Sequence, residues 1–146
     1  MTDHQSQNTS NQDASAQKQT FFDLLGGEAT GETNIRALVD AFYDVMDTDA
    51  KVASIRAMHP ADLSGSRDKL SLFLTGWTGG PQLYIERYGH PFLRKRHMPF
   101  AIDASARDQW MYCMIQAMHQ LQFDENLMTK LAQQLYGVAD FMRNQE

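Results

Sequence analysis

A histidine that directly follows three cations is the clearest candidate for chemistry in this sequence. Residues 93–97 read LRKRH, and no carboxylate occurs within residues 88–100 to neutralise the positive charge. An imidazole nitrogen ligates iron, and a guanidinium group pairs with the carboxylates of an anionic ligand. A haem meets both requirements, with His97 on the iron and arginine on the propionates. A solvated basic turn explains the same residues, and on this run alone it is the simpler interpretation.

The other histidines carry weaker signals. His59 and His90 each precede a proline, where a polar side chain commonly stabilises a corner or a turn. His119 lies about 180° around a predicted helix from Trp110, at ~100° per residue, so we expect it in solvent. His4 belongs to the polar N-terminal segment. None of these positions has the spacing of a metalloenzyme motif such as HExxH.

Motif and composition exclude several other classes of site. The sequence has no GxSxG elbow and no glycine-rich phosphate loop, because its two Gly-Gly pairs fall where helices are expected to end. The single cysteine, Cys113, excludes an intramolecular disulfide and a cysteine-rich zinc site. Its place on an apolar helix face favours a packed thiol over a nucleophile. The net charge of −5 argues against a nucleic-acid partner. The three adjacent cations at residues 94–96 form too small a basic patch to bind one.

Apolar residues at helical spacing predict the elements that must position these side chains. Helices are expected over residues 21–25, 35–46, 51–57, 63–77, 105–121 and 124–142, and a less regular stretch with one short helical turn over 81–99. Thr20 is placed to cap the first helix, and Asp103 or Ser105 to cap the fifth. The last two helices are expected to bury Trp110, Cys113, Met114, Ala117, Met118 and Leu121, then Leu127, Leu131, Leu135, Val138 and Met142. Alternation at period two is absent, which indicates an all-α fold class.

The first residues of the chain differ in composition from the rest. Residues 1–19 are polar and contain no large apolar side chain after Met1. Such a segment buries too little surface to offset its ordering entropy, so we expect a disordered polar tail over 1–19 and one folded domain over 20–146. The longest apolar run, residues 110–115, has six residues against the ~20 of a membrane span, and no secretory signal is present. We therefore expect a cytoplasmic protein without a membrane span.

Longer motifs resemble a known family. Residues 88–100 read YGHPFLRKRHMPF, and residues 107–114 read RDQWMYCM, which places a tryptophan thirteen residues after His97. The further matching features are Phe42-Tyr43, the predicted helix over 63–77, and the Gly-Gly pairs at 26–27 and 79–80. Together these features resemble the group II truncated haemoglobins over residues 20–143. The resemblance implies a truncated globin fold, a sandwich of two helices over two around haem b.

The resemblance also implies a role for each candidate site residue. His97 is expected to ligate the iron, with Arg96 and Tyr84 at the haem propionates. The residues expected on the haem faces are Leu70, Phe73, Leu93 and Phe100. On the opposite, distal side the resemblance places Tyr43, His59 and Trp110 as hydrogen-bond donors to a bound ligand, and Ser66 at the gate for ligands. His59 departs from the family pattern, in which this corner residue is often Tyr or Phe.

These roles imply reversible binding of O2 and other diatomic ligands, such as NO and CO, at an iron that is five-coordinate or internally ligated by Tyr43 or His59. Each hydrogen bond to a ligand with negative charge contributes ~1.5–3 kcal/mol, so strong distal bonding slows O2 release and does not suit oxygen transport. The alternative is a redox enzyme that detoxifies NO or peroxide, as an NO dioxygenase or in a peroxidase-like reaction, with His59 as an acid–base group. Catalytic turnover would imply an external reductase as a partner.

Overall fold

The computed structural model describes residues 19–146, so the expected tail lies, apart from Gln19, outside the described residues. The described part of the chain is helical throughout and contains no strand, which confirms the predicted all-α class. The helices are α2 (Phe21–Leu24), α3 (Gly27–Thr48), η1 (Ala50–Val52), α4 (Ala53–Ala57), α5 (Ser64–Trp77), α6 (Leu83–Tyr88), α7 (Leu93–His97), α8 (Ala104–Gln120) and α9 (Glu125–Phe141).

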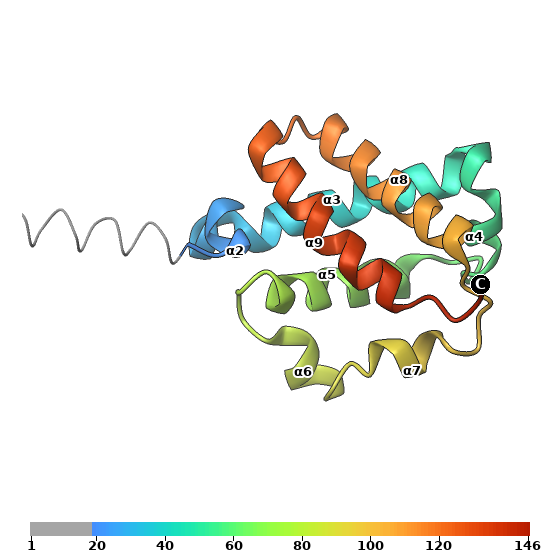
Figure 1. Cartoon of the computed structure of the whole chain (residues 1–146). Coiled ribbons are helices and arrows are strands. Elements are labelled where there is room, and N and C mark those ends of the chain that lie inside the picture. The colour runs from blue at the N-terminus through green and yellow to red at the C-terminus, as the bar shows by residue number, and fades with distance from the viewer. Residues whose placement is uncertain (1–18) are drawn as a thin grey trace, which may run out of the picture.

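Two pairs of long helices form the body of the molecule. Helix α3 packs against α5, α8 packs against α9, and the two pairs meet where α3 lies against α8. This arrangement agrees with the predicted sandwich of two helices over two. Figure 1 shows α6 and α7 at the bottom of the view, below α5 and away from α3.

Apolar faces of α3 and α8 form the centre of the core. The residues that they bury most completely are Ile35, Val39, Phe42, Met46, Cys113, Met114, Ala117 and Met118. These positions follow the predicted spacing, because residues three and four apart share one face of a helix. Burial of each large side chain contributes about 1.5–3 kcal/mol, so this face fixes α3 and α8 as the scaffold on which a site is held.

Polar caps start the helices at the predicted places. The Thr20 hydroxyl accepts a hydrogen bond from the Asp23 amide at 3.1 Å, and the Asp23 carboxylate accepts one from the Thr20 amide, which makes a capping box. Asp103, and not Ser105, caps α8 through a 2.8 Å bond from the Ala106 amide. Gly26 separates α2 from α3 with φ at 120°, a left-handed value that favours glycine.

Four details of the predicted helices need correction. The helix expected over 35–46 begins eight residues earlier, because α3 runs from Gly27 to Thr48 and Gly27 starts this helix instead of ending the one before it. The stretch over 81–99 contains two short helices, α6 and α7, because six residues are too few for periodicity to reveal α6. The helix expected over 51–57 begins as the 3-10 turn η1, since the Asp49 side chain accepts a bond from the Lys51 amide. Leu121 is 38% exposed, because α8 has already ended at this residue.

Within residues 19–146 no helix is long and apolar enough to cross a membrane.

Candidate functional site

A cavity of about 550 Å³ opens among α3, α5, α7, α8 and α9, with a wall from the corner between α4 and α5. This volume lies within the ~300–1,000 Å³ of small-molecule and cofactor sites. The cavity brings together all eleven candidate residues, namely Tyr43, His59, Ser66, Leu70, Phe73, Tyr84, Leu93, Arg96, His97, Phe100 and Trp110. Residues from five helices (α3, α5, α6, α7 and α8) and from two connecting segments thus meet around one space, while their individual roles stay predictions.

His97 is the last residue of α7 and presents one nitrogen for ligation. Its Nδ1 lies 2.6 Å from the Leu93 carbonyl oxygen, one helical turn earlier. Because a carbonyl only accepts, Nδ1 carries the proton and donates it. The lone pair of the imidazole is therefore on Nε2, which is the state and the orienting contact that metal-bound histidines show.

Asn144, near the C-terminus, holds the segment that follows His97. Its amide nitrogen donates to the His97 carbonyl at 3.3 Å and to the Phe100 carbonyl at 2.8 Å, and its amide oxygen accepts from the Ile102 amide at 2.9 Å. These three bonds tie residues 97–102 to Asn144, which follows the end of α9. The sequence carries no local signal for them, since the partners are more than forty residues apart.

Tyr43 supplies a hydroxyl from α3 and is only 5% exposed. Its ring meets Phe42 edge-on, with 4.9 Å between ring centroids, and His59 at 5.9 Å. Burial raises the pKa of Tyr43 to about 12, although the nearby charge of Arg67 acts in the opposite direction. The Tyr43 hydroxyl therefore keeps its proton at neutral pH and is available as a hydrogen-bond donor.

Trp110 faces the same space from α8. Its ring packs edge-on against Phe42 with 5.1 Å between centroids, so Phe42 contacts the rings of both Trp110 and Tyr43. The indole nitrogen only donates, and it adds a second donor to the cavity wall. The fully buried Phe42 is not itself a lining residue, but it fixes the relative positions of two that are.

His59 differs from its expected role as a donor. Its Nδ1 lies 2.8 Å from the Ile55 carbonyl oxygen, so Nδ1 carries the proton of the neutral ring. Burial lowers the pKa of His59, and the charge of Arg56 lowers it further, while the bond to Ile55 acts in the opposite direction. The ring is therefore neutral near pH 7 with Nε2 as an acceptor. Neutral His59 accepts a hydrogen bond or a proton at Nε2, and donates from there only when protonated.

The lowered pKa of His59 predicts an acid-sensitive fold. At pH values between the ordinary pKa of 6.5 and the lower pKa of the folded protein, His59 is protonated in the unfolded chain and neutral in the folded one. The free energy of unfolding should therefore fall as the pH drops from 6.5 toward 5. Urea denaturation of the wild type and of His59→Gln at each pH checks this, with a shallower loss expected for the variant. Equal losses in the two proteins would show that His59 is not the responsible group.

Cations at the cavity wall include two that sequence reasoning missed. Arg96 was predicted, and Lys69 and Arg107 join it. Arg107 pairs with Asp108 at 3.0 Å and with Asp140 at 2.8 Å, and these carboxylates raise the pKa of its guanidinium. Its position three residues before Trp110 on one helix face was the available signal.

The remaining wall is mostly apolar, and the whole donor set fits a haem. Phe73 meets Tyr84 edge-on with 6.3 Å between centroids, and Leu70, Leu93 and Phe100 continue this surface. Phe100 remains 42% exposed, which leaves an aromatic face uncovered by protein. A flat apolar cofactor with an iron and two carboxylates matches apolar walls, one free imidazole nitrogen and cations at the wall.

Comparison with known proteins agrees with this description. Residues 20–144 match the bacterial-like globin family. The Group 2 truncated hemoglobin YjbI of Bacillus subtilis (strain 168) is 39% identical over 121 residues, which cover 81% of this chain and 87% of that protein.

Two solved structures extend the likeness to three dimensions. The cold-adapted truncated hemoglobin of the Antarctic marine bacterium Pseudoalteromonas haloplanktis TAC125 superposes with a TM-score of 0.81 at 41% identity, over 88% of this chain and all of that one. The group II 2-on-2 hemoglobin of Agrobacterium tumefaciens gives 0.79 at 41% identity, over 88% of this chain and 97% of that one. The chain therefore belongs to the bacterial-like globin family, and within it to the group II truncated haemoglobins.

Proposed function

We propose that this globin holds haem b and reversibly binds O2 and other diatomic ligands under strong distal hydrogen bonding. Membership of the globins implies haem-based binding of small ligands. The single observation that carries the proposal of reversible ligand binding is that one cavity has a candidate iron ligand and a candidate hydrogen-bond donor on its walls. His97 presents Nε2 there, because its Nδ1 faces the Leu93 carbonyl, and Tyr43 offers a buried hydroxyl that keeps its proton.

On the proximal side, His97 would ligate the iron through Nε2, and its bond to Leu93 would keep the ring in that orientation. Arg96 and Tyr84 would meet the propionates, and Lys69 and Arg107 line the same cavity as further cations. When bound, haem supplies an iron atom that takes a diatomic ligand. The apolar side chains of Leu70, Phe73, Leu93 and Phe100 would cover the ring and exclude water from it.

On the distal side, Tyr43 and Trp110 would donate to a ligand that carries partial negative charge. His59 would accept a hydrogen bond or a proton at Nε2 and, while its ring is neutral, would not donate to the ligand. Its ring meets the Tyr43 ring edge-on at 5.9 Å between centroids, which places His59 beside this proposed donor. Ser66, in the first turn of α5, would occupy the gate.

The absorption spectrum of the purified protein tests this proposal. We expect an intense Soret band in the ferric state and its shift on reduction under CO. The ferric spin state reports whether the iron is five-coordinate or internally ligated, and Tyr43→Phe should alter it only if Tyr43 is the internal ligand. Absence of a Soret band after addition of haem would refute the proposal.

A second candidate, a redox enzyme that acts on NO or peroxide, is favoured by one observation. Burial keeps His59 neutral within the cavity, so that its Nε2 is able to accept a proton from peroxide. Turnover in either reaction would need electrons from an external reductase. The lifetime of the O2 complex with and without added NO separates the two functions, because only NO consumption shortens it.

A further inference from the structure

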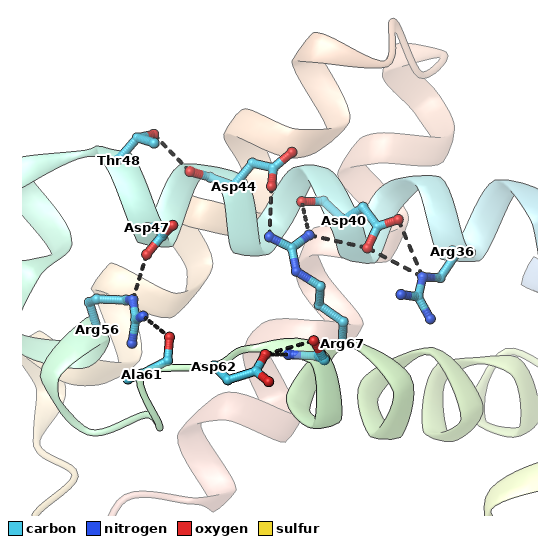
Figure 2. A network of polar contacts seen from close by, with 10 residues as sticks. Arg36, Asp40, Asp44, Asp47, Thr48, Arg56, Ala61, Asp62 and Arg67 are labelled. Carbon is cyan, nitrogen blue, oxygen red and sulfur yellow. Dashed lines mark hydrogen bonds and ion pairs between the residues drawn. The ribbon is translucent and has the colours of Figure 1, made fainter.

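Two arginines tie the distal side of the cavity to α3. We name residues 58–63, which join α4 to α5, the distal corner; it contains His59 and Pro60, both on the cavity wall. Arg56 precedes this corner and Arg67 follows it. Both reach across to carboxylates on α3, as Figure 2 shows. The distal corner is thus held at both ends.

Arg56 fixes the backbone of the distal corner itself. Its Nε donates to Asp47 Oδ1 at 2.8 Å, and its two terminal nitrogens donate to the carbonyl oxygens of Pro60 and Ala61, each at 3.0 Å. The bonds to Pro60 and Ala61 use carbonyls that lie outside any helix and would otherwise face water. One side chain therefore determines how the corner lies relative to α3.

Arg67 fixes the first turn of α5, immediately after Ser66. It donates to the Asp40 carbonyl and carboxylate, each at 3.1 Å, and to Asp44 Oδ1 at 2.7 Å. Its guanidinium carbon lies 5.8 Å from the centroid of the Tyr43 ring, within the range of a cation–π contact. Arg67 therefore ties the first turn of α5, which carries Ser66, to α3, and its guanidinium lies over the ring of Tyr43.

The carboxylates form a continuous stripe on α3. Asp40, Asp44 and Asp47 follow each other at spacings of four and three, so they share one face, and Tyr43 lies between the first two. Their side chains are between 41% and 67% exposed, whereas Arg56 and Arg67 are 23% and 21% exposed. The pairs are accordingly ionic contacts at the surface, which salt screens and which open without disturbing the core.

We propose that Arg56 and Arg67 form an ionic clamp that closes the distal corner and Ser66 against α3, and that opening of this clamp sets the rate at which small ligands enter and leave the cavity. The inference rests on the proposed function, because only a cavity that binds diatomic ligands has such a rate. Arg56 and Arg67 act as positioning residues, through the corner and Tyr43, and contact no ligand themselves.

The test compares Arg56→Gln and Arg67→Gln with a matched control, Arg36→Gln. Arg36 belongs to the same surface network, pairing with Asp40 at 3.2 Å and Asp68 at 2.7 Å, but it contacts neither the corner nor Tyr43. The readouts on the haem-loaded protein are CO association and dissociation rates after flash photolysis. We expect a rise of about five- to ten-fold in both rates for each clamp variant and wild-type rates for the control.

Two further readouts separate gating from a general loss of stability. High salt should raise the wild-type and control CO rates toward those of the clamp variants, and leave the clamp variants nearly unchanged. Amide hydrogen exchange should accelerate in residues 58–63 of the clamp variants and stay slow in the core of α3 and α8. If a clamp variant does not fold, Asp47→Asn removes the ion pair of Arg56 and Asp44→Asn removes one of the two ion pairs of Arg67, each from the more exposed partner.

Three outcomes would overturn the proposed ionic clamp. Normal haem spectra with unchanged CO rates in the clamp variants would overturn the clamp while leaving the proposed function intact. Equal acceleration in Arg36→Gln would overturn it too, since the effect would then belong to the whole network. A wild-type protein that takes up no haem would overturn the proposed function, and the gating inference with it.

Discussion

Replacement of His97 by glycine is expected to weaken haem binding on the order of 100-fold or more and to remove the five-coordinate ferrous spectrum. Loss of partners that merely orient a metal ligand costs about 10- to 100-fold in affinity, so loss of the ligand itself should exceed that range. Among the described residues, His59 is the only other histidine on the cavity wall, and it belongs to the corner between α4 and α5 and not to α7.

The fold itself should survive this change. His97 is the last residue of a five-residue helix and is only partly buried, and the segment after it remains bonded to Asn144 through backbone carbonyls. The glycine removes the imidazole and leaves a space beside Leu93. Added imidazole should enter that space and restore the spectrum, which would show that ligation and not folding was lost.

His90→Gly is the matched control for this experiment. His90 lies seven residues earlier in the same irregular segment, is exposed, and accepts a bond from the Phe92 amide at 3.1 Å. This contact agrees with the predicted role of His90 as a turn residue. We expect haem affinity and spectrum close to wild type. Retention of a normal spectrum in His97→Gly would contradict the assignment of His97 as the iron ligand.

Periodicity predicted the long helices because their burial repeats every three to four residues. The face with Ile35, Val39, Phe42 and Met46 is nearly inaccessible to solvent, and His119 on the opposite face of α8 is exposed, as expected. Helix ends that carry a capping side chain were also predictable, as at Thr20. Short helices such as α6 were not, since one or two turns contain too few residues to define a face.

The sequence predicted residues that the fold brings together, while the roles of these residues stay predictions. The resemblance to truncated haemoglobins named eleven residues, and all of them line one cavity. Proton positions depend on contacts that sequence spacing does not encode, so the acceptor nitrogen of His59 follows only from its place beside the Ile55 carbonyl. Ion pairs between residues far apart in the chain, such as Arg67 with Asp40, could not be predicted for the same reason.

Removal of the proposed distal donors, Tyr43 and Trp110, should accelerate O2 release. We expect Tyr43→Phe to raise the O2 dissociation rate about 10- to 100-fold, because a hydrogen bond to a charged acceptor contributes ~1.5–3 kcal/mol and each 1.4 kcal/mol is tenfold. Stopped-flow displacement of O2 by CO measures this rate. The change should leave the free energy of unfolding nearly unaltered, because phenylalanine keeps the buried ring and its edge-on contact with Phe42.

Tyr112→Phe is the control for loss of a tyrosine hydroxyl. Tyr112 donates to Asp49 Oδ2 at 2.7 Å, on a side of α8 that does not line the cavity. Its removal should lower the free energy of unfolding and leave the O2 dissociation rate at the wild-type value. An unchanged O2 rate in Tyr43→Phe would contradict the assignment of Tyr43 as a donor to the ligand.

The double variant Tyr43→Phe, Trp110→Leu should release O2 roughly 100-fold faster than the wild type, or more, if both donors reach the ligand. The two changes should not be additive, because Phe42 packs against both rings at 4.9 and 5.1 Å and transmits a shift of one to the other. A double-mutant cycle on the O2 dissociation rate measures this coupling. Strict additivity would mean that each donor acts alone, and it would remove Phe42 from the set of residues that position them.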